Sequence, residues 1–249
     1  MKVSFSNLAW EPDEDDRVAE VLHSHHISSI ELAPGRYRDR PPADVRRAWS
    51  DRGFTIGALQ SLCFGHPELS VFDTPDATLD HLATVATLAT QLGASTLVFG
   101  SPANRRRGTR SVAEVWGPAV TFLQRAGAIV ADHGCVLTVE AAPVRYGGDF
   151  CVTTDEAAAW VREADHPAVR LQLDTGILAI DGTDDLHAAL VGHIHISEPG
   201  LGELRPDPDT AARVRARFPT FGVTVEMLRG PDPVAAVARS AAIAVAAYG

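Results

Sequence analysis

Short apolar runs alternate with longer amphipathic segments along the whole chain. In the longer segments, apolar residues recur at the spacing of one helical face, most clearly in Pro75–Leu92. The short runs are typical of buried strands. The predicted strands are Val3–Ser6, Ser29–Leu32, Phe54–Gln60, Thr96–Phe99, Val136–Glu140, Val169–Asp174, His193–Ile196 and Gly222–Glu226. The predicted helices are Asp13–Ser24, Pro42–Asp51, Pro75–Leu92, Val112–Asp132, Thr154–Ala164, Asp184–Leu190, Asp209–Arg217 and Val234–Ala247.

Eight strand–helix units in 249 residues give about 31 residues per unit, the size of one step in a βαβ repeat. Strict alternation predicts parallel strands with helices outside, and eight units of this size match a (β/α)₈ TIM barrel of the α/β class. An open doubly wound sheet is the alternative. Such sheets usually carry a glycine-rich turn after the first strand, whereas this position reads Ser6–Trp10, SNLAW. No linker-like tract divides the chain, so we expect one domain, residues 1–249.

The net charge of −10 at pH 7 disfavours a general nucleic-acid binder, which needs a basic face. A membrane protein is also not expected. The most apolar segment, Val234–Tyr248, contains Arg239 and is shorter than the roughly 20 residues of a span. We expect no signal peptide, because Lys2 leads directly into a strand pattern. Three scattered cysteines without a C-x-x-C motif indicate a reducing, cytoplasmic environment.

The last four predicted strands each end in a residue that can bind a metal: Glu140, Asp174, His195 and Glu226. In a TIM barrel, the carboxyl ends of the strands meet at the active-site face. A single strand-end carboxylate can simply cap a helix or pair with an arginine. Four such residues in succession favour one shared site.

Three carboxylates at one mouth repel one another, and a divalent cation is the simplest way to keep them together and ionised. An oxygen-rich set with one imidazole suits Mn²⁺ or Mg²⁺, with Co²⁺ or Zn²⁺ as alternatives. We therefore expect one divalent metal ion as the cofactor.

The segments VLTVEAAP, LQLDTG, HIHISE and GVTVEML resemble the four metal-ligand segments of the sugar phosphate isomerase/epimerase family. This family belongs to the xylose isomerase-like TIM barrels, with ketose 3-epimerases, inosose dehydratases and, more distantly, endonuclease IV. The resemblance spans the whole chain. It implies that Glu140, Asp174, His195 and Glu226 form the metal set and that both glutamates act as the acid/base pair.

The chemistry of such a site is coherent by itself. A metal that chelates a carbonyl and its neighbouring hydroxyl stabilises an enediolate. One carboxylate removes the α-carbon proton, and a second can return a proton from the other side. Glu140 and Glu226 are the candidates for these roles.

Two departures from the family pattern limit what can be transferred. The aspartate segment often reads D-x-x-H, whereas here it is Asp174-Thr175-Gly176-Ile177, which favours one metal over a multi-metal endonuclease site. In ketose 3-epimerases an arginine closely follows the H-x-x-E motif. Here Glu198 is present, but the next arginine is Arg205.

Further residues are candidates for substrate binding. Glu31 and Gln60 end strands two and three and therefore face the mouth, or they order loops. Glu198 either holds the second nitrogen of His195 or is a solvated loop acid. His193, two residues before His195, is interpreted as a hydrogen-bonded core residue rather than a ligand. The candidate substrate-binding set is Glu31, Gln60, His66, Arg105, Glu198 and Arg205.

A basic cluster follows the fourth strand. Its arginines suit recognition of phosphate or carboxylate, or form a solvated loop, and Arg105 is the favoured contact. The segment Tyr146–Phe150 after the fifth strand is interpreted as a lid or a turn. The cluster comprises Arg105, Arg106, Arg107 and Arg110.

Together these features predict a metal-dependent isomerase or epimerase of a sugar, sugar phosphate or cyclitol ketone, acting through an enediolate. A dehydratase or lyase with the same metal site is the alternative. A phosphodiesterase like endonuclease IV is disfavoured by the charge and by the absent histidine, and a non-catalytic barrel by the complete ligand set. The expected partner is a small carbohydrate, and a homodimer is expected only by analogy with other barrels.

Overall fold

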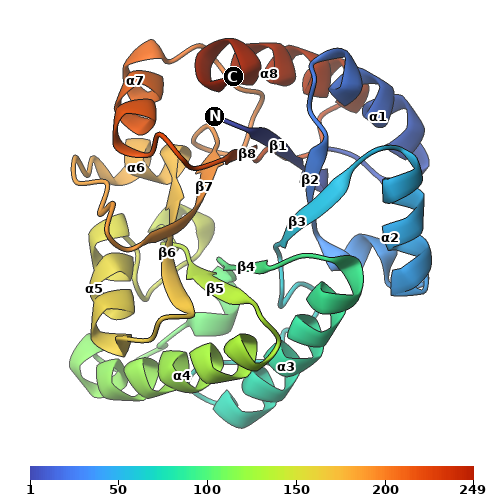
Figure 1. The fold of residues 1–249 in the computed structure, drawn as a ribbon. Helices are drawn as coiled ribbons and strands as arrows, with labels where there is room; N and C mark the ends of the chain where they lie inside the picture. Colours follow the sequence, from blue (N-terminus) through green and yellow to red (C-terminus); the bar gives the residue numbers. More distant parts are fainter.

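The computed structural model describes all 249 residues and forms a closed barrel of eight parallel strands. The strands follow one another in chain order, and β1 closes the ring by pairing with β8. Figure 1 shows the strands as an inner ring and the helices as an outer ring. The prediction of a single (β/α)₈ barrel is therefore confirmed. The strands are β1 Val3–Ser6, β2 Ser29–Leu32, β3 Thr55–Leu59, β4 Thr96–Phe99, β5 Val136–Val139, β6 Val169–Asp174, β7 Val191–Ile196 and β8 Val223–Val225.

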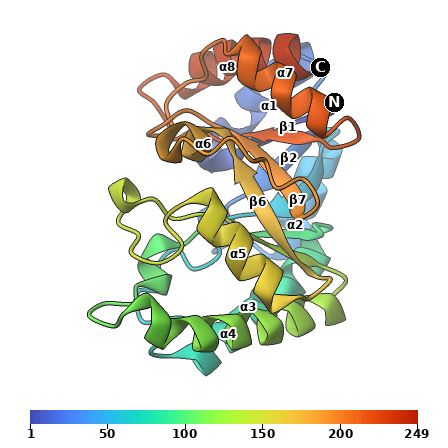
Figure 2. The same ribbon diagram turned by 90° about the vertical axis from the view of Figure 1, so that its left-hand side faces the viewer.

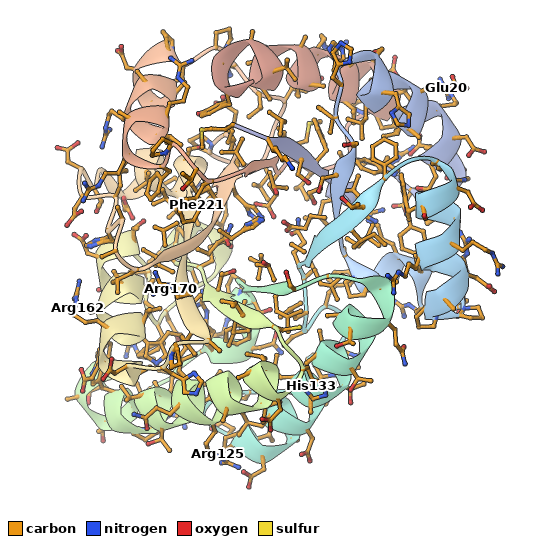
Figure 3. All side chains as sticks on the ribbon, viewed as in Figure 1. Glu20, Arg125, His133, Arg162, Arg170 and Phe221 are labelled. Carbon is orange, nitrogen blue, oxygen red and sulfur yellow. The ribbon has the colours of Figure 1, made fainter.

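In chain order, one α-helix follows each strand. Polar side chains of these helices point away from the barrel, as Figure 3 shows for Glu20, Arg125 and Arg162. The helices are α1 Asp15–Ser24, α2 Pro42–Asp51, α3 Pro75–Leu92, α4 Val112–Asp132, α5 Thr154–Ala164, α6 Thr175–Asp181, α7 Pro208–Arg217 and α8 Pro233–Tyr248. Short 3₁₀ turns occupy loops at Asn7–Ala9, Pro12–Glu14, Pro34–Tyr37, Pro102–Arg105 and Val144–Tyr146.

The predicted helix at Asp184–Leu190 is wrong: those residues form an irregular loop and a turn. The sixth helix instead begins directly after β6. The Asp174 carboxylate caps it by accepting a hydrogen bond of 2.7 Å from the Ile177 N–H, and Gly182, at φ +69°, ends it. Asp174 therefore caps a helix as well as ending a strand.

Apolar side chains fill the layer between strands and helices, in one cluster of 68 buried residues that runs around the whole barrel. The space inside the strands is different, because it holds buried polar groups. These include Glu31, Thr138, Gln172, His195 and Thr224. Burying such groups costs free energy unless they are paired or bind a ligand, so the polar interior marks where function is expected.

The two ends of the chain lie side by side at the edge of the barrel (Figure 1), where the amino group of Met1 donates a hydrogen bond of 2.7 Å to the Tyr248 carbonyl. In the side view of Figure 2, α7 and α8 lie together at one edge of the molecule, and α3 and α4 at the other. None of the helices combines the length and the apolar character needed to span a bilayer.

Candidate metal centre at the mouth of the barrel

A cavity of about 210 Å³ lies at the carboxyl ends of the strands. Glu140, Asp174 and Glu226 line it together with residues of the loops that follow β1, β3, β4, β5 and β7. Asp174 is the last residue of β6, and Glu140 and Glu226 stand one position beyond β5 and β8. Because the strands are parallel, the three carboxylates at the ends of β5, β6 and β8 lie together in one cavity.

His195 brings a nitrogen to the same point. One potential ligand atom from each of Glu140, Asp174, His195 and Glu226 lies within 4.8 Å of the others. The Nδ1 atom of His195 is 3.5 Å from Glu140 Oε1 and 3.2 Å from Glu226 Oε2. The four residues that the sequence indicated as ligands therefore converge at one place.

The other nitrogen of His195 is held by Glu31 from β2, which is separated from β7 by β8 and β1 in the ring. Its Nε2 atom lies 3.0 Å from Glu31 Oε1, and both side chains are almost completely buried. A carboxylate at Nε2 favours the tautomer with its proton there and leaves the Nδ1 lone pair free. The sequence left Glu198 as a candidate for this role or as a solvated loop acid, and in the structure its carboxylate accepts a hydrogen bond from the Arg205 N–H.

Crowding of the carboxylates changes their acidity. Burial, followed by repulsion from Glu140 and Glu226, raises the pKa of Asp174 to about 8. Burial also raises the pKa of Glu140, with Glu226 adding to the effect. For His195 burial acts in the opposite direction, yet the facing carboxylates of Glu31 and Glu226 bring its pKa well above the ordinary value. The cluster thus favours an added positive charge at its centre.

Asp174 is oriented by its neighbours. The Ser197 hydroxyl, just after β7, lies 2.8 Å from both carboxylate oxygens of Asp174. The Ile177 N–H donates to Oδ1 as well. These contacts fix the carboxylate plane before any ligand binds, which reduces the cost of ordering a coordinating group. The sequence analysis did not identify Ser197 as a functional residue. Its position two residues after His195, just beyond the end of β7, could have indicated that it faces the same site.

The donor set fits a divalent cation. Glu140 Oε1 and His195 Nδ1 are buried without a hydrogen-bond partner, and both face the cluster. Three oxygen ligands and one imidazole suit a hard or borderline cation. A bound cation would take the place of a proton at His195 Nδ1 and compensate the three carboxylates.

Replacing Glu31 by Gln is expected to lower the affinity for Mn²⁺ by about 10- to 100-fold, since the neutral amide is a poorer partner for the His195 N–H than the carboxylate. Titration of the purified protein with Mn²⁺, followed by the EPR signal of free Mn²⁺, measures this change. Glu198→Gln is the matched control and is expected to bind Mn²⁺ like the unchanged protein. Equal losses in both variants would contradict the role assigned to Glu31.

Arg105 lies beside this site but not in its cavity. Its guanidinium is buried over the rings of Phe99 and Trp160, and it donates a hydrogen bond of 2.6 Å to the Glu140 carbonyl oxygen. The structure therefore places Arg105 behind the candidate metal-binding residues, where it anchors the chain at Glu140.

The other predicted substrate contacts divide into two groups. Gln60 lines the cavity and donates from Nε2 to the Ser6 hydroxyl, whereas Glu31 lies below the ligand set. His66 is outside the cavity and pairs with Glu68, and Arg205 is largely exposed next to Glu198. Gln60 is thus the member of the set that reaches the cavity directly.

His193 is one layer deeper in the barrel, as its spacing from His195 suggested. Its Nε2 atom lies 3.4 Å from Glu31 Oε2 and 3.3 Å from the Thr224 hydroxyl. Burial lowers the pKa of His193 to about 4, so the imidazole is neutral. It does not reach the mouth of the barrel.

Part of the segment Tyr146–Phe150 reaches the cavity. Tyr146 lines it, and the Tyr146 hydroxyl accepts a hydrogen bond of 2.7 Å from the Gly200 N–H, which links the loops after β5 and β7. Phe150 packs instead against Phe72 and Trp160 in the core. The segment bridges two loops over the site.

The chain belongs to the family described as xylose isomerase-like TIM barrel, whose model matches residues 19–226. A search of curated protein sequences finds no match. The family expected from the four strand-end segments is therefore confirmed.

Solved structures extend the comparison. The 3-keto-D-glucoside 4-epimerase of E. coli is 18% identical, with a TM-score of 0.78, covering 97% of this chain and 98% of that one. The IOLI protein with a binding zinc atom is 16% identical, with a TM-score of 0.77 and coverage of 99% and 98%. A probable 3-DHS dehydratase from Bacillus anthracis is 14% identical, with a TM-score of 0.72 and coverage of 98% and 98%. At these identities the likeness establishes a shared fold.

Proposed function

We propose that this protein is a divalent-metal-dependent isomerase or epimerase of a small polyhydroxylated carbonyl compound, acting through an enediolate. The observation that carries the proposal is the convergence of Glu140, Asp174, His195 and Glu226 on one cavity at the active-site face. Two glutamates within reach of one bound substrate can serve both as metal ligands and as proton carriers. The family and its structural neighbours, which include an epimerase, support this function.

The metal, when bound, polarises a carbonyl and its neighbouring hydroxyl and stabilises developing negative charge. One glutamate accepts the proton of the α-carbon, and the electron pair of that C–H bond moves toward the carbonyl oxygen. The other glutamate, protonated, returns a proton to the opposite face for epimerisation. Burial and the neighbouring Glu226 raise the pKa of Glu140, which makes its carboxylate a stronger base toward an α-carbon proton.

Mn²⁺ or Mg²⁺ is the proposed metal, because three of the four ligands are carboxylates. The zinc in the structure of the IOLI protein keeps Zn²⁺ among the candidates. Arg105 supports the reaction indirectly in this proposal, since its hydrogen bond to the Glu140 carbonyl holds one of the two proton carriers in place.

The proposal predicts solvent exchange at carbon. The Mn²⁺-loaded protein, incubated with a panel of ketoses and cyclitol ketones in D₂O, is expected to replace a carbon-bound hydrogen by deuterium without loss of water, as followed by ¹H NMR and mass spectrometry. Protein treated with EDTA is the control and is expected to lose the exchange. Absence of exchange with every member of the panel would contradict an isomerase.

A dehydratase is the second candidate, supported by the probable 3-DHS dehydratase among the structural neighbours. It begins with the same proton abstraction and then expels a β-hydroxyl group as water. The same incubation separates the two, because the dehydratase product is lighter by one water molecule.

A further inference from the structure

The cavity wall carries charge only where the metal cluster forms its floor. Of the 14 lining residues, Glu140, Asp174 and Glu226 are ionisable acids, and none is an arginine, lysine or histidine. The polar neutral side chains are Gln60, Ser61, Ser101 and Tyr146. The remaining wall is mostly apolar and includes Leu8, Val98, Pro102, Ala141, Ile177 and Leu201.

The arginines of the loop after β4 lie outside the cavity, and each makes a contact within the protein, although Nε and Nη1 of the buried Arg105 have no hydrogen-bond partner. The buried guanidinium of Arg105 donates to the Glu140 carbonyl. Arg106 donates to the Gly147 carbonyl, and Arg107 to the Asp149 carbonyl. Arg110 forms an ion pair of 2.8 Å with Asp73. These contacts tie neighbouring loops together, and none of the arginines of the basic cluster lines the cavity.

Several arginines on other loops of the same face are also paired, whereas Arg40 and Arg145 are exposed, contact tyrosine rings and do not line the cavity. Arg229, after β8, forms two hydrogen bonds with the Glu14 carboxylate, at 2.9 and 3.0 Å. Arg36, after β2, pairs with Glu11 and also donates to the Leu8 carbonyl. Arg205 lies beside Glu198. Recruiting Arg229 or Arg36 to a substrate would leave a carboxylate or a carbonyl without its partner, and the exposed side chain of Arg205 does not line the cavity.

The net charge at the centre of the cavity also disfavours binding of an anionic substrate. Three carboxylates and one divalent cation leave a net charge of about −1 when His195 is neutral, as metal ligation requires. In a partly enclosed site this charge is weakly screened, so a phosphate or carboxylate on the substrate would be repelled. Anionic substrates are then disfavoured for two reasons: the cavity carries a negative charge, and its lining has no cationic side chain to pair with them.

We propose that the substrate is an uncharged polyhydroxylated carbonyl compound, carrying neither a phosphate nor a carboxylate, and that the cavity discriminates against its phosphorylated counterparts. The inference rests on the proposed function, of which it narrows the substrate class. In this arrangement the apolar wall contacts the C–H faces of the substrate, and Gln60, Ser61 and Ser101 face its hydroxyl groups.

The test compares matched pairs of ligands on the Mn²⁺-loaded protein: a ketopentose and a ketohexose, each with and without a terminal phosphate, and a cyclic hydroxyketone with and without a carboxylate. Binding is measured by the relaxation that protein-bound Mn²⁺ induces in the ligand protons, and turnover by exchange in D₂O. The uncharged members are expected to bind about 100-fold more tightly than the charged ones.

The two readouts keep this inference separate from the proposed function. Tighter binding of uncharged ligands without any exchange or water loss would support the substrate class and contradict the enzyme activity. Equal or tighter binding of the charged members would overturn the inference, whatever the turnover. It would also fail if none of the six ligands were relaxed by Mn²⁺.

A variant provides a gain-of-function check. Leu8 lines the cavity and is partly exposed, so Leu8→Arg places a cation at its wall, and Leu8→Gln is the matched uncharged control. Leu8→Arg is expected to improve the binding of the ketohexose phosphate at least about 10-fold relative to Leu8→Gln. A phosphate ligand that already binds the unchanged protein well, and gains nothing from the arginine, would contradict the proposal.

Discussion

Replacing Glu226 by Gln is expected to reduce carbon-bound hydrogen exchange by about 10³-fold or more, while the barrel stays folded. Glu226 stands one residue beyond β8, and its Oε2 atom lies 3.2 Å from His195 Nδ1. The amide of Gln has nearly the same shape as the carboxylate but cannot carry the proton. It also removes one of the three negative charges at the metal cluster.

Three measurements are needed, because loss of exchange alone has several causes. Exchange in D₂O reports turnover, circular dichroism with thermal unfolding reports the fold, and the EPR signal of free Mn²⁺ reports metal binding. Glu203→Gln is the control: it removes an exposed carboxylate that pairs with Arg239 and does not line the cavity. Full exchange in the Glu226 variant would remove this residue from the mechanism.

The strand-end rule explains why so much of the site could be predicted from the sequence. Parallel strands in a closed ring place their carboxyl ends on one face, so residues at those ends share a location even when far apart in the chain. Glu140, Asp174 and Glu226 follow from this rule and from the apolar runs before them. The positions of these three residues at the ends of predicted strands were sufficient to place them at the mouth of the barrel.

Contacts across the barrel were not predictable in this way. Glu31 and His195 are 164 residues apart, and their pairing depends on the diameter of the ring and on side-chain direction. The position of Arg105 could not be predicted either. Its place in the loop after β4 suggested a substrate contact, but its guanidinium packs over the rings of Phe99 and Trp160. Periodicity carries no information about such packing.

The sixth helix shows a different limit. Its sequence after Asp174 is short and apolar, and a helix of seven residues carries too little periodicity to be recognised. The capping contacts of Asp174 and the left-handed Gly182 define it instead. The residues of the expected helix, Asp184–Leu190, contain acidic side chains in a helix-like order but form a loop before β7.

Gly100→Ala is expected to weaken Mn²⁺ binding by about 10- to 100-fold and to lower exchange by about 100-fold, without altering any metal ligand. Gly100 follows β4 and lines the cavity. A Cβ atom at this position would lie 2.6 Å from Glu140 Oε2, closer than such atoms approach in proteins. The carboxylate is the flexible end of its side chain, so it would move away from the cluster rather than unfold the barrel.

The thermal midpoint of Gly100→Ala is therefore expected to stay close to that of the unchanged protein, which separates a displaced ligand from a damaged fold. Gly202→Ala is the matched control on the same face, because a Cβ atom there meets nothing within 4 Å. Unchanged Mn²⁺ affinity in Gly100→Ala would mean that the Glu140 carboxylate can shift without loss, and hence that the metal is held by the other three residues. A shared loss of stability in both variants would instead assign the effect to the loops that carry them.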